Sequence, residues 1–174
     1  MSPQAAEGRS ENPTFAPEEL LFRRVPYSHI EDGEVNALAI ASETKFDPDP
    51  KKCTSVLRSA YTESFLDALR TDCAAGKDLS KTHTVMHVTV SDLPKGLEID
   101  PPQKDSRLRW DMYADHNPLP LCYAHSTICC CNEKEPGKAV LPPPSVRKQF
   151  REWFAAELRP SKAPEADPAR LSSQ

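Results

Sequence analysis

The sequence predicts an α+β fold, in which a mostly antiparallel sheet of four to six strands carries two main helices on one face. Several short stretches alternate apolar and polar residues with the period of a strand. Two longer stretches, near the middle and near the end, repeat apolar residues at helical spacing. With 174 residues, the chain is long enough for one domain with a substantial core.

The ends of the chain are poor in apolar residues and rich in Pro, Glu, Ser and Ala. Such segments bury too little apolar surface to offset the entropy of ordering them. We therefore expect a single globular domain over residues 17–158, with disordered tails over residues 1–16 and 159–174.

Residues 18–25 form a short apolar run that contains two arginines and is closed by Pro26. Because proline has no N–H to donate inside a sheet, this run is expected to be an edge strand. A turn centred on Asp32-Gly33 follows, then a segment of small apolar residues from residue 35, and then an irregular loop with two Asp-Pro pairs.

Residues 53–76 contain the first predicted helix. Thr62 is placed to cap it, and Gly76 is placed to end it in a left-handed conformation. Apolar residues recur between them at helical spacing. The preceding residues 53–61 are either a short strand or the lead-in to this helix.

Residues 82–90 read THTVMHVTV, and their β-branched residues predict a strand. A short strand is expected over 97–100 and another over 107–114, with Trp110 and Met112 on one face. The second helix is predicted to begin with Ser145 as its cap and to carry an apolar stripe as far as Leu158.

The segment from Asp115 to Cys131 holds two of the five histidines and four of the six cysteines. Residues 121–130 within it are expected to form a strand. Alternation would then direct Cys122 and Cys130 into the packing and leave His125 and Thr127 as the exposed pair.

Composition excludes several classes of function. The formal net charge is −4 and no basic block occurs, which argues against broad nucleic-acid affinity. With five glycines, the chain has no glycine-rich phosphate loop, and no cofactor is expected. The sequence shows no long apolar run and no secretory leader, so we expect a cytoplasmic protein without a membrane partner whose cysteines are free thiols.

Two histidines share a pattern of apolar residue, His, any residue, Thr and apolar residue. His87 is followed by Thr89, and His125 by Thr127. This pattern resembles the paired His-x-Thr/Ser motifs of the two-histidine phosphoesterases. The resemblance implies that one histidine is a general base, the other a general acid, and that both threonine hydroxyls bind phosphate. The alternative interpretation is that these are half-exposed strand residues with a structural role.

Cys122, His125 and Cys129 have the ligand types and spacing of some structural zinc sites. A strand, however, would direct Cys122 and His125 to opposite faces, and no second Cys-x-x-Cys pair exists. We therefore expect no metal, and these three residues remain the candidates if one binds.

A second set of landmarks runs through the chain: Leu-Phe-Arg-Arg-Val at residues 21–25, Ser-Val-Leu-Arg at 55–58 and Asn-Pro at 117–118 followed by His125. These resemble the ordered landmarks of small bacterial cytosolic proteins of undefined activity. The resemblance implies an accessory protein, encoded beside defence or toxin–antitoxin genes. It would gather Arg23, Arg24 and Arg58 with His125 into a polar binding cluster, and the alternative is that the arginines are surface charges.

We therefore expect a non-enzymatic cytosolic interaction or accessory protein of bacterial origin, with another protein as its partner. The alternative is a metal-independent two-histidine phosphoesterase that acts on cyclic or 2′,5′-linked phosphates through His87 and His125.

Overall fold

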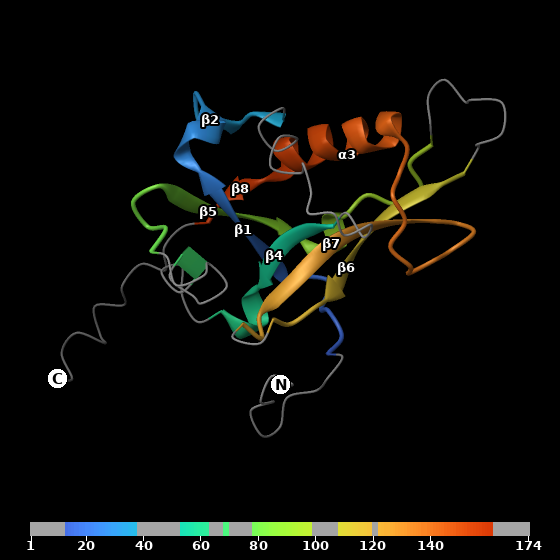
Figure 1. Ribbon diagram of the computed structural model, residues 1–174, viewed down its shortest axis with the longest axis horizontal. Coiled ribbons are helices and arrows are strands. Elements are labelled where there is room, and N and C mark those ends of the chain that lie inside the picture. Colours follow the sequence, from blue (N-terminus) through green and yellow to red (C-terminus); the bar gives the residue numbers. More distant parts are fainter. Residues whose placement is uncertain are drawn as a thin grey trace.

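The computed structural model describes residues 13–37, 53–62, 68–69, 78–98, 108–119 and 122–161. Six strands form one sheet in the order β6-β7-β4-β1-β5-β8, and every neighbouring pair is antiparallel (Figure 1). These strands are β1 (Leu20–Pro26), β4 (Thr54–Arg58), β5 (His83–Thr89), β6 (Trp110–His116), β7 (His125–Asn132) and β8 (Arg159–Pro160). The predicted α+β class with a mostly antiparallel sheet is confirmed.

The helix α3 (Pro144–Glu157) packs along one face of the sheet (Figure 1). Its buried residues Val146, Phe150 and Phe154 join a core cluster with residues from the strands, among them Leu21 and Met86. The predicted cap at Ser145 is wrong, because α3 starts one residue earlier and has Pro143 at its N-cap position with no side-chain hydrogen bond. Proline suits the first helical position, because its φ is already helical and it has no N–H to leave unpaired there.

A second core cluster lies on the opposite face of the sheet. It joins Leu57 and Val85 to Ala68, Leu69 and Cys122. Alternation explains the two clusters, because Val56 and Met86 face α3 while their neighbours Leu57 and Val85 face away from it. The central strands are therefore buried on both faces.

The prediction of two main helices on one face is not confirmed, since α3 is the one long helix among the described residues. Within the predicted helical region 53–76, residues 54–58 form β4, which is the strand alternative, and Ser59–Tyr61 form a 3₁₀ turn. Ala68 and Leu69 are helical. The other residues of that prediction after Thr62 lie outside the described part of the chain.

The strand β1 is central, between β4 and β5, so its prediction as an edge strand is wrong. Pro26 is its last residue and pairs with His83 at the end of the ladder, where a missing N–H interrupts no interior pairing. One further backbone bond follows the ladder, in which the Tyr27 N–H donates to the Thr82 carbonyl.

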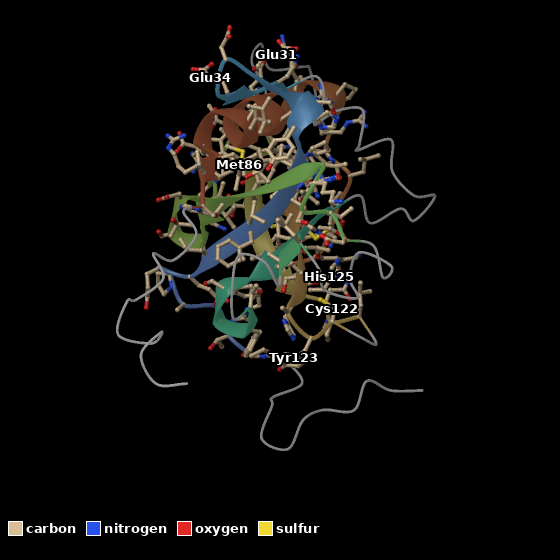
Figure 2. All side chains as sticks on the ribbon, turned by 90° about the vertical axis from the view of Figure 1, so that its left-hand side faces the viewer. Glu31, Glu34, Met86, Cys122, Tyr123 and His125 are labelled. Atoms are coloured by element: carbon tan, nitrogen blue, oxygen red, sulfur yellow. A yellow bond between two sulfur atoms is a disulfide. The ribbon has the colours of Figure 1, made fainter. Side chains whose placement is uncertain are left out.

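Asp32 and Gly33 form the predicted turn. They connect β2 (Ile30–Glu31) to β3 (Glu34–Val35) in a two-residue hairpin loop, which Glu31 and Glu34 flank (Figure 2). Both have positive φ, 51° for Asp32 and 83° for Gly33. Positive φ at both positions is the geometry of a type I′ turn, which Asp-Gly adopts readily. The predicted loop over 45–52 lies outside the described residues.

Strand predictions near the middle of the chain are confirmed for β5 and β6, and β7 begins at His125 rather than at residue 121. Leu97 makes an isolated bridge to Trp110, and residues 99–100 lie outside the described part. The boundaries predicted for the tails fall inside ordered structure, because Phe15 stacks on Arg58 and Arg159–Pro160 form β8.

Candidate functional site

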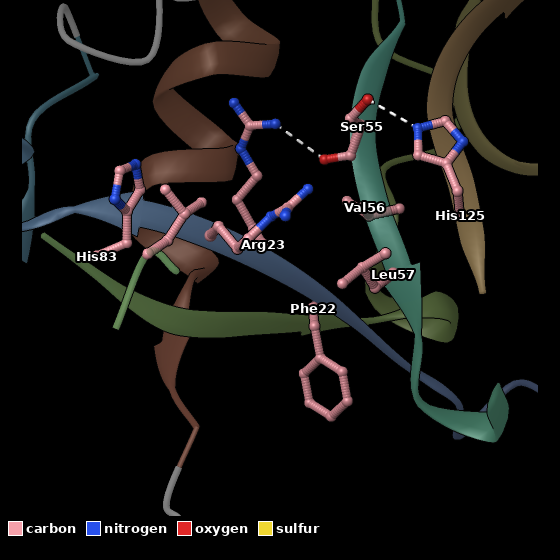
Figure 3. Close-up of a pocket in the computed structure, with 9 residues that line it drawn as sticks. Phe22, Arg23, Ser55, Val56, Leu57, His83 and His125 are labelled. Carbon is pink, nitrogen blue, oxygen red and sulfur yellow. Dashed lines mark hydrogen bonds between the residues drawn. The ribbon is translucent and has the colours of Figure 1, made fainter. Parts of the chain in front are cut away.

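A pocket of about 390 Å³ opens between β1 and β4 (Figure 3). Its titratable lining groups are all basic: Arg23, Arg24, His83 and His125. The remaining lining residues are Ser55 and the apolar Phe22, Val56, Leu57 and Leu79. This volume lies within the range of small-molecule sites. A basic lining with an apolar floor suits an anionic group attached to an apolar body.

The pocket exists because β1 and β4 are paired over only a short length. Their ladder consists of Leu21 opposite Arg58 and Phe22 opposite Leu57. Beyond these pairs the strands diverge, and the Arg23 side chain spans the gap by donating from Nη1 to the Ser55 carbonyl at 2.8 Å (Figure 3). Arg23 thus holds the two walls of the pocket at a defined separation.

Arg24 contributes a cation whose environment disfavours its charge. Burial lowers the pKa of its guanidinium, and the neighbouring charge of Arg23 lowers that pKa further. Among the described residues, no group accepts a hydrogen bond from the buried Nη1 of Arg24. Leaving a buried charged donor unsatisfied costs more than leaving a neutral one. An anion bound in the pocket would offset the positive charges of Arg23 and Arg24.

His125 connects β7 to β4 through a side-chain pair. Its Nε2 lies 2.9 Å from the Ser55 hydroxyl (Figure 3). Its Nδ1 lies 2.5 Å from the Asn117 carbonyl oxygen. The prediction that His125 is exposed is wrong, because only 7 % of it is accessible. Burial lowers its pKa most, the bond to Asn117 raises it, and the charge of Arg24 lowers it. The imidazole is therefore neutral at neutral pH.

The phosphoesterase resemblance requires His87 and His125 to face each other across one phosphate, and the structure does not bring them together. The ladders align His125 with Leu57, Leu57 with Phe22 and Phe22 with His87, so the two histidines share a row and a face. The two strands β4 and β1 lie between them, however, and three strand spacings amount to about 14 Å. A single phosphate does not reach both rings.

His87 and the two threonines have other surroundings. His87 Nδ1 lies 2.9 Å from the hydroxyl of Ser161, beside β8, and burial followed by the charge of Arg159 lowers its pKa. Thr89 pairs with Leu20 at the end of β5, whereas Thr127 pairs with Ser55 on β4. None of His87, Thr89 and Thr127 lines the pocket. The geometry thus gives no support to a two-histidine site.

Arg58 is separate from the other two arginines. It is 1 % exposed, and its Nε and Nη2 donate to the two carboxylate oxygens of Glu19, each at 2.7 Å. It also donates to the carbonyl oxygens of Pro13 and Thr14, and its guanidinium lies 3.9 Å from the centre of the Phe15 ring. With its donors satisfied inside the protein, Arg58 anchors the start of the domain. The predicted binding role does not fit this position.

The cysteines correct the prediction of free thiols. Cys53 and Cys129 form a disulfide that joins β7 to the residue before β4, and Cys122 is disulfide-bonded as well. Cys130 and Cys131 are free, and burial together with Cys131 raises the pKa of Cys130 to about 12. Since Cys122 and Cys129 have no thiolate to offer, they do not form a zinc site with His125. The described residues contain no group of three or more side chains suited to hold a metal.

Sequence reasoning selected Arg23, Arg24 and His125, and the structure brings these three to one pocket. It missed Ser55 and His83. Ser55 lies in one of the bacterial landmarks, but a serine on a strand carries no signal by itself. Asn117 acts through its backbone carbonyl, which side-chain patterns do not reveal.

Comparisons with protein-family models, with curated proteins and with solved structures found no match for this chain. No helix among the described residues is long and apolar enough to cross a membrane.

Proposed function

We propose that this protein is an interaction or accessory protein that holds an anionic group of its partner, a carboxylate or a phosphate, in the pocket between β1 and β4. The observation that carries the proposal is that Arg24 lines a pocket whose titratable lining is entirely basic, while its buried Nη1 has no acceptor among the described residues. Charge-assisted hydrogen bonds from arginine to these anions are among the strongest in proteins.

The apolar part of the lining supports a particular kind of ligand. Phe22, Leu57 and Leu79 line the same pocket as the two arginines. An anion attached to an aromatic or aliphatic body would bury apolar surface against these residues while its charge meets Arg24. The proposal therefore favours such a group over a small inorganic ion.

Calorimetric titration with phenyl phosphate tests the proposal, with phenol as the neutral comparison. Wild type should bind phenyl phosphate more tightly than phenol, and added salt should weaken the difference. Arg24→Gln should reduce the affinity about 10- to 100-fold, since a hydrogen bond to a charged group contributes about 1.5–3 kcal/mol.

Two control variants separate this site from general charge effects. Arg109→Gln removes a charge that is 65 % exposed, and His87→Ala removes the histidine outside the pocket. Both variants should bind phenyl phosphate with an affinity within about twofold of wild type, as expected for changes distant from the site. Equal binding of phenol and phenyl phosphate, or full affinity in Arg24→Gln, would refute the proposal.

The bacterial origin and a place beside defence or toxin–antitoxin genes stay predictions of the landmark resemblance. The cytoplasmic location also stays a prediction, and it has lost one of its supports. Disulfides persist mainly in oxidising compartments, whereas Cys53, Cys129 and Cys122 are all disulfide-bonded.

A further inference from the structure

The hydroxyl of Ser55 and the ring of His125 are arranged in a defined donor and acceptor order. The Asn117 carbonyl only accepts hydrogen bonds, so the Nδ1 atom 2.5 Å from it carries the proton. In the neutral ring, Nε2 is then the unprotonated nitrogen. The Ser55 hydroxyl, 2.9 Å away, therefore donates to Nε2.

This order is that of a nucleophile, its general base and a group that orients the base. Activated serines lie within about 2.6–3.2 Å of the base, and a third group holds the correct tautomer of that base. Ser55, His125 and the Asn117 carbonyl meet both conditions. The lowered pKa of His125 agrees with this role, because its ring is neutral and able to take a proton at neutral pH.

Ser55 and His125 differ in solvent exposure in the way that such a reaction needs. Ser55 is exposed and lines the pocket, whereas His125 is 7 % exposed. A substrate in the pocket reaches the hydroxyl directly, and the base is sheltered from bulk water. The disulfide between Cys53 and Cys129 joins the same two chain segments two residues before Ser55 and four after His125, which restrains their separation.

We propose that Ser55 is a nucleophile, activated by His125, that accepts the acyl group of a carboxylic ester carrying a negative charge elsewhere in the molecule. The selectivity for an anionic ester rests on the proposed function, since Arg24 would hold that charge. An acyl ester fits better than a phosphate ester, because phosphoryl transfer usually employs several cations at the reacting oxygens and Arg23 is engaged with the Ser55 carbonyl.

The reaction balances with water as the only co-reactant. Ser55 Oγ forms a bond to the carbonyl carbon while His125 Nε2 takes the hydroxyl proton. The bond from the carbonyl carbon to the leaving oxygen then breaks, and the proton passes to that oxygen to release an alcohol. Water next attacks the acyl-serine with His125 as base, which releases a carboxylic acid and restores Ser55.

The test uses the mono-p-nitrophenyl ester of succinate, which is anionic, and p-nitrophenyl butyrate, which is neutral. Wild type should release p-nitrophenol faster from the succinate ester, and peptide mapping by mass spectrometry should find the succinyl group on Ser55. Ser55→Ala should abolish this adduct. His125→Asn keeps a donor near the Asn117 carbonyl but removes Nε2, and should slow acylation about 10²- to 10⁴-fold.

In protein that stays folded at each pH, the rate of acylation should also fall as the pH is lowered through the pKa of His125, a response that a purely structural residue would not produce. Ser91→Ala is the matched control, because Ser91 is exposed and outside the pocket, and it should leave the rate unchanged. Circular dichroism establishes that each variant is folded.

Acylation at another residue, or an unchanged rate in folded Ser55→Ala, would overturn the proposal. If phenyl phosphate binds through Arg24 but no acyl-serine forms, the nucleophile is refuted and the binding function stands. If both esters acylate Ser55 equally and Arg24→Gln changes neither rate, the nucleophile stands and the anion selectivity is refuted. Hydrolysis of p-nitrophenyl phosphate in place of the succinate ester would overturn the choice of an acyl substrate.

Discussion

Replacement of Glu19 by glutamine tests whether Arg58 is a structural cation rather than a binding residue. The two side chains are 5 % and 2 % exposed, and the carboxylate accepts from Nε and Nη2 of the guanidinium. Glutamine keeps the shape but removes the charge, so Arg58 remains buried without its counter-ion. Breaking a buried pair from one side costs about 3–5 kcal/mol. For a domain of this size, the melting temperature should fall by about 6–20 °C.

Urea unfolding followed by circular dichroism measures this change. The matched control is Glu98→Gln, which breaks the pair with Arg109, whose side chains are 63 % and 65 % exposed. Exposed pairs contribute about 0–1 kcal/mol, so this control should shift stability little. A cost below about 1 kcal/mol for Glu19→Gln would contradict a structural role for Arg58, because the buried pair would then behave as an exposed one. Phenyl phosphate affinity should be unchanged in folded Glu19→Gln, since Arg58 does not line the pocket.

Three further predictions concern the disulfide, the histidines and the core. The double variant Cys53→Ser/Cys129→Ser should lose about 2–5 kcal/mol, because a cross-link between residues 76 apart restricts the unfolded chain; an unchanged urea midpoint would contradict this. Lowering the pH from 7.5 to 5 should destabilise the protein, since the pKa values of His87, His116 and His125 lie below the usual 6.5 and the unfolded chain takes up protons first. The stability that these neutral histidines contribute is present above pH 6.5 and is lost below it. His125→Asn should reduce this loss of stability, measured by urea unfolding. A free energy of unfolding that does not change with pH would contradict the prediction. Phe154→Ala should cost about 3–5 kcal/mol in the same assay, because the ring is 3 % exposed and its removal leaves a cavity beneath α3; a loss under 1 kcal/mol would place the helix off the core.

Local patterns predicted most strands well because strand alternation is a local property. The run over 82–90 became β5, and Trp110 and Met112 are buried on one face of β6 as expected. The same patterns failed where burial depends on distant partners. β1 was assigned to an edge on account of Pro26, yet β4 and β5 flank it, because a proline at the last strand residue interrupts no interior pairing.

The candidate site was predicted in part for the same reason. Arg24 and His125 stood out as residue types and reach one pocket, whereas Ser55 carried no signal. Ser55 and His125 are 70 residues apart in sequence, and the β4–β7 ladder, together with the Cys53–Cys129 disulfide, brings them within hydrogen-bonding distance. Residue type alone likewise could not separate Arg58, which is paired with Glu19, from Arg24, whose Nη1 has no acceptor among the described residues.

Local sequence patterns were enough to predict the α+β class, most of the strand segments and the Asp32-Gly33 turn, because these depend on neighbouring residues and on the backbone freedom of glycine. Tertiary structure decided the order of the strands, the pairing of Cys53 with Cys129 and the separation of His87 from His125 by two strands. Each of these depends on contacts between residues far apart along the chain. Such contacts are set by how two sheet faces are buried at once, which no single stretch of sequence specifies.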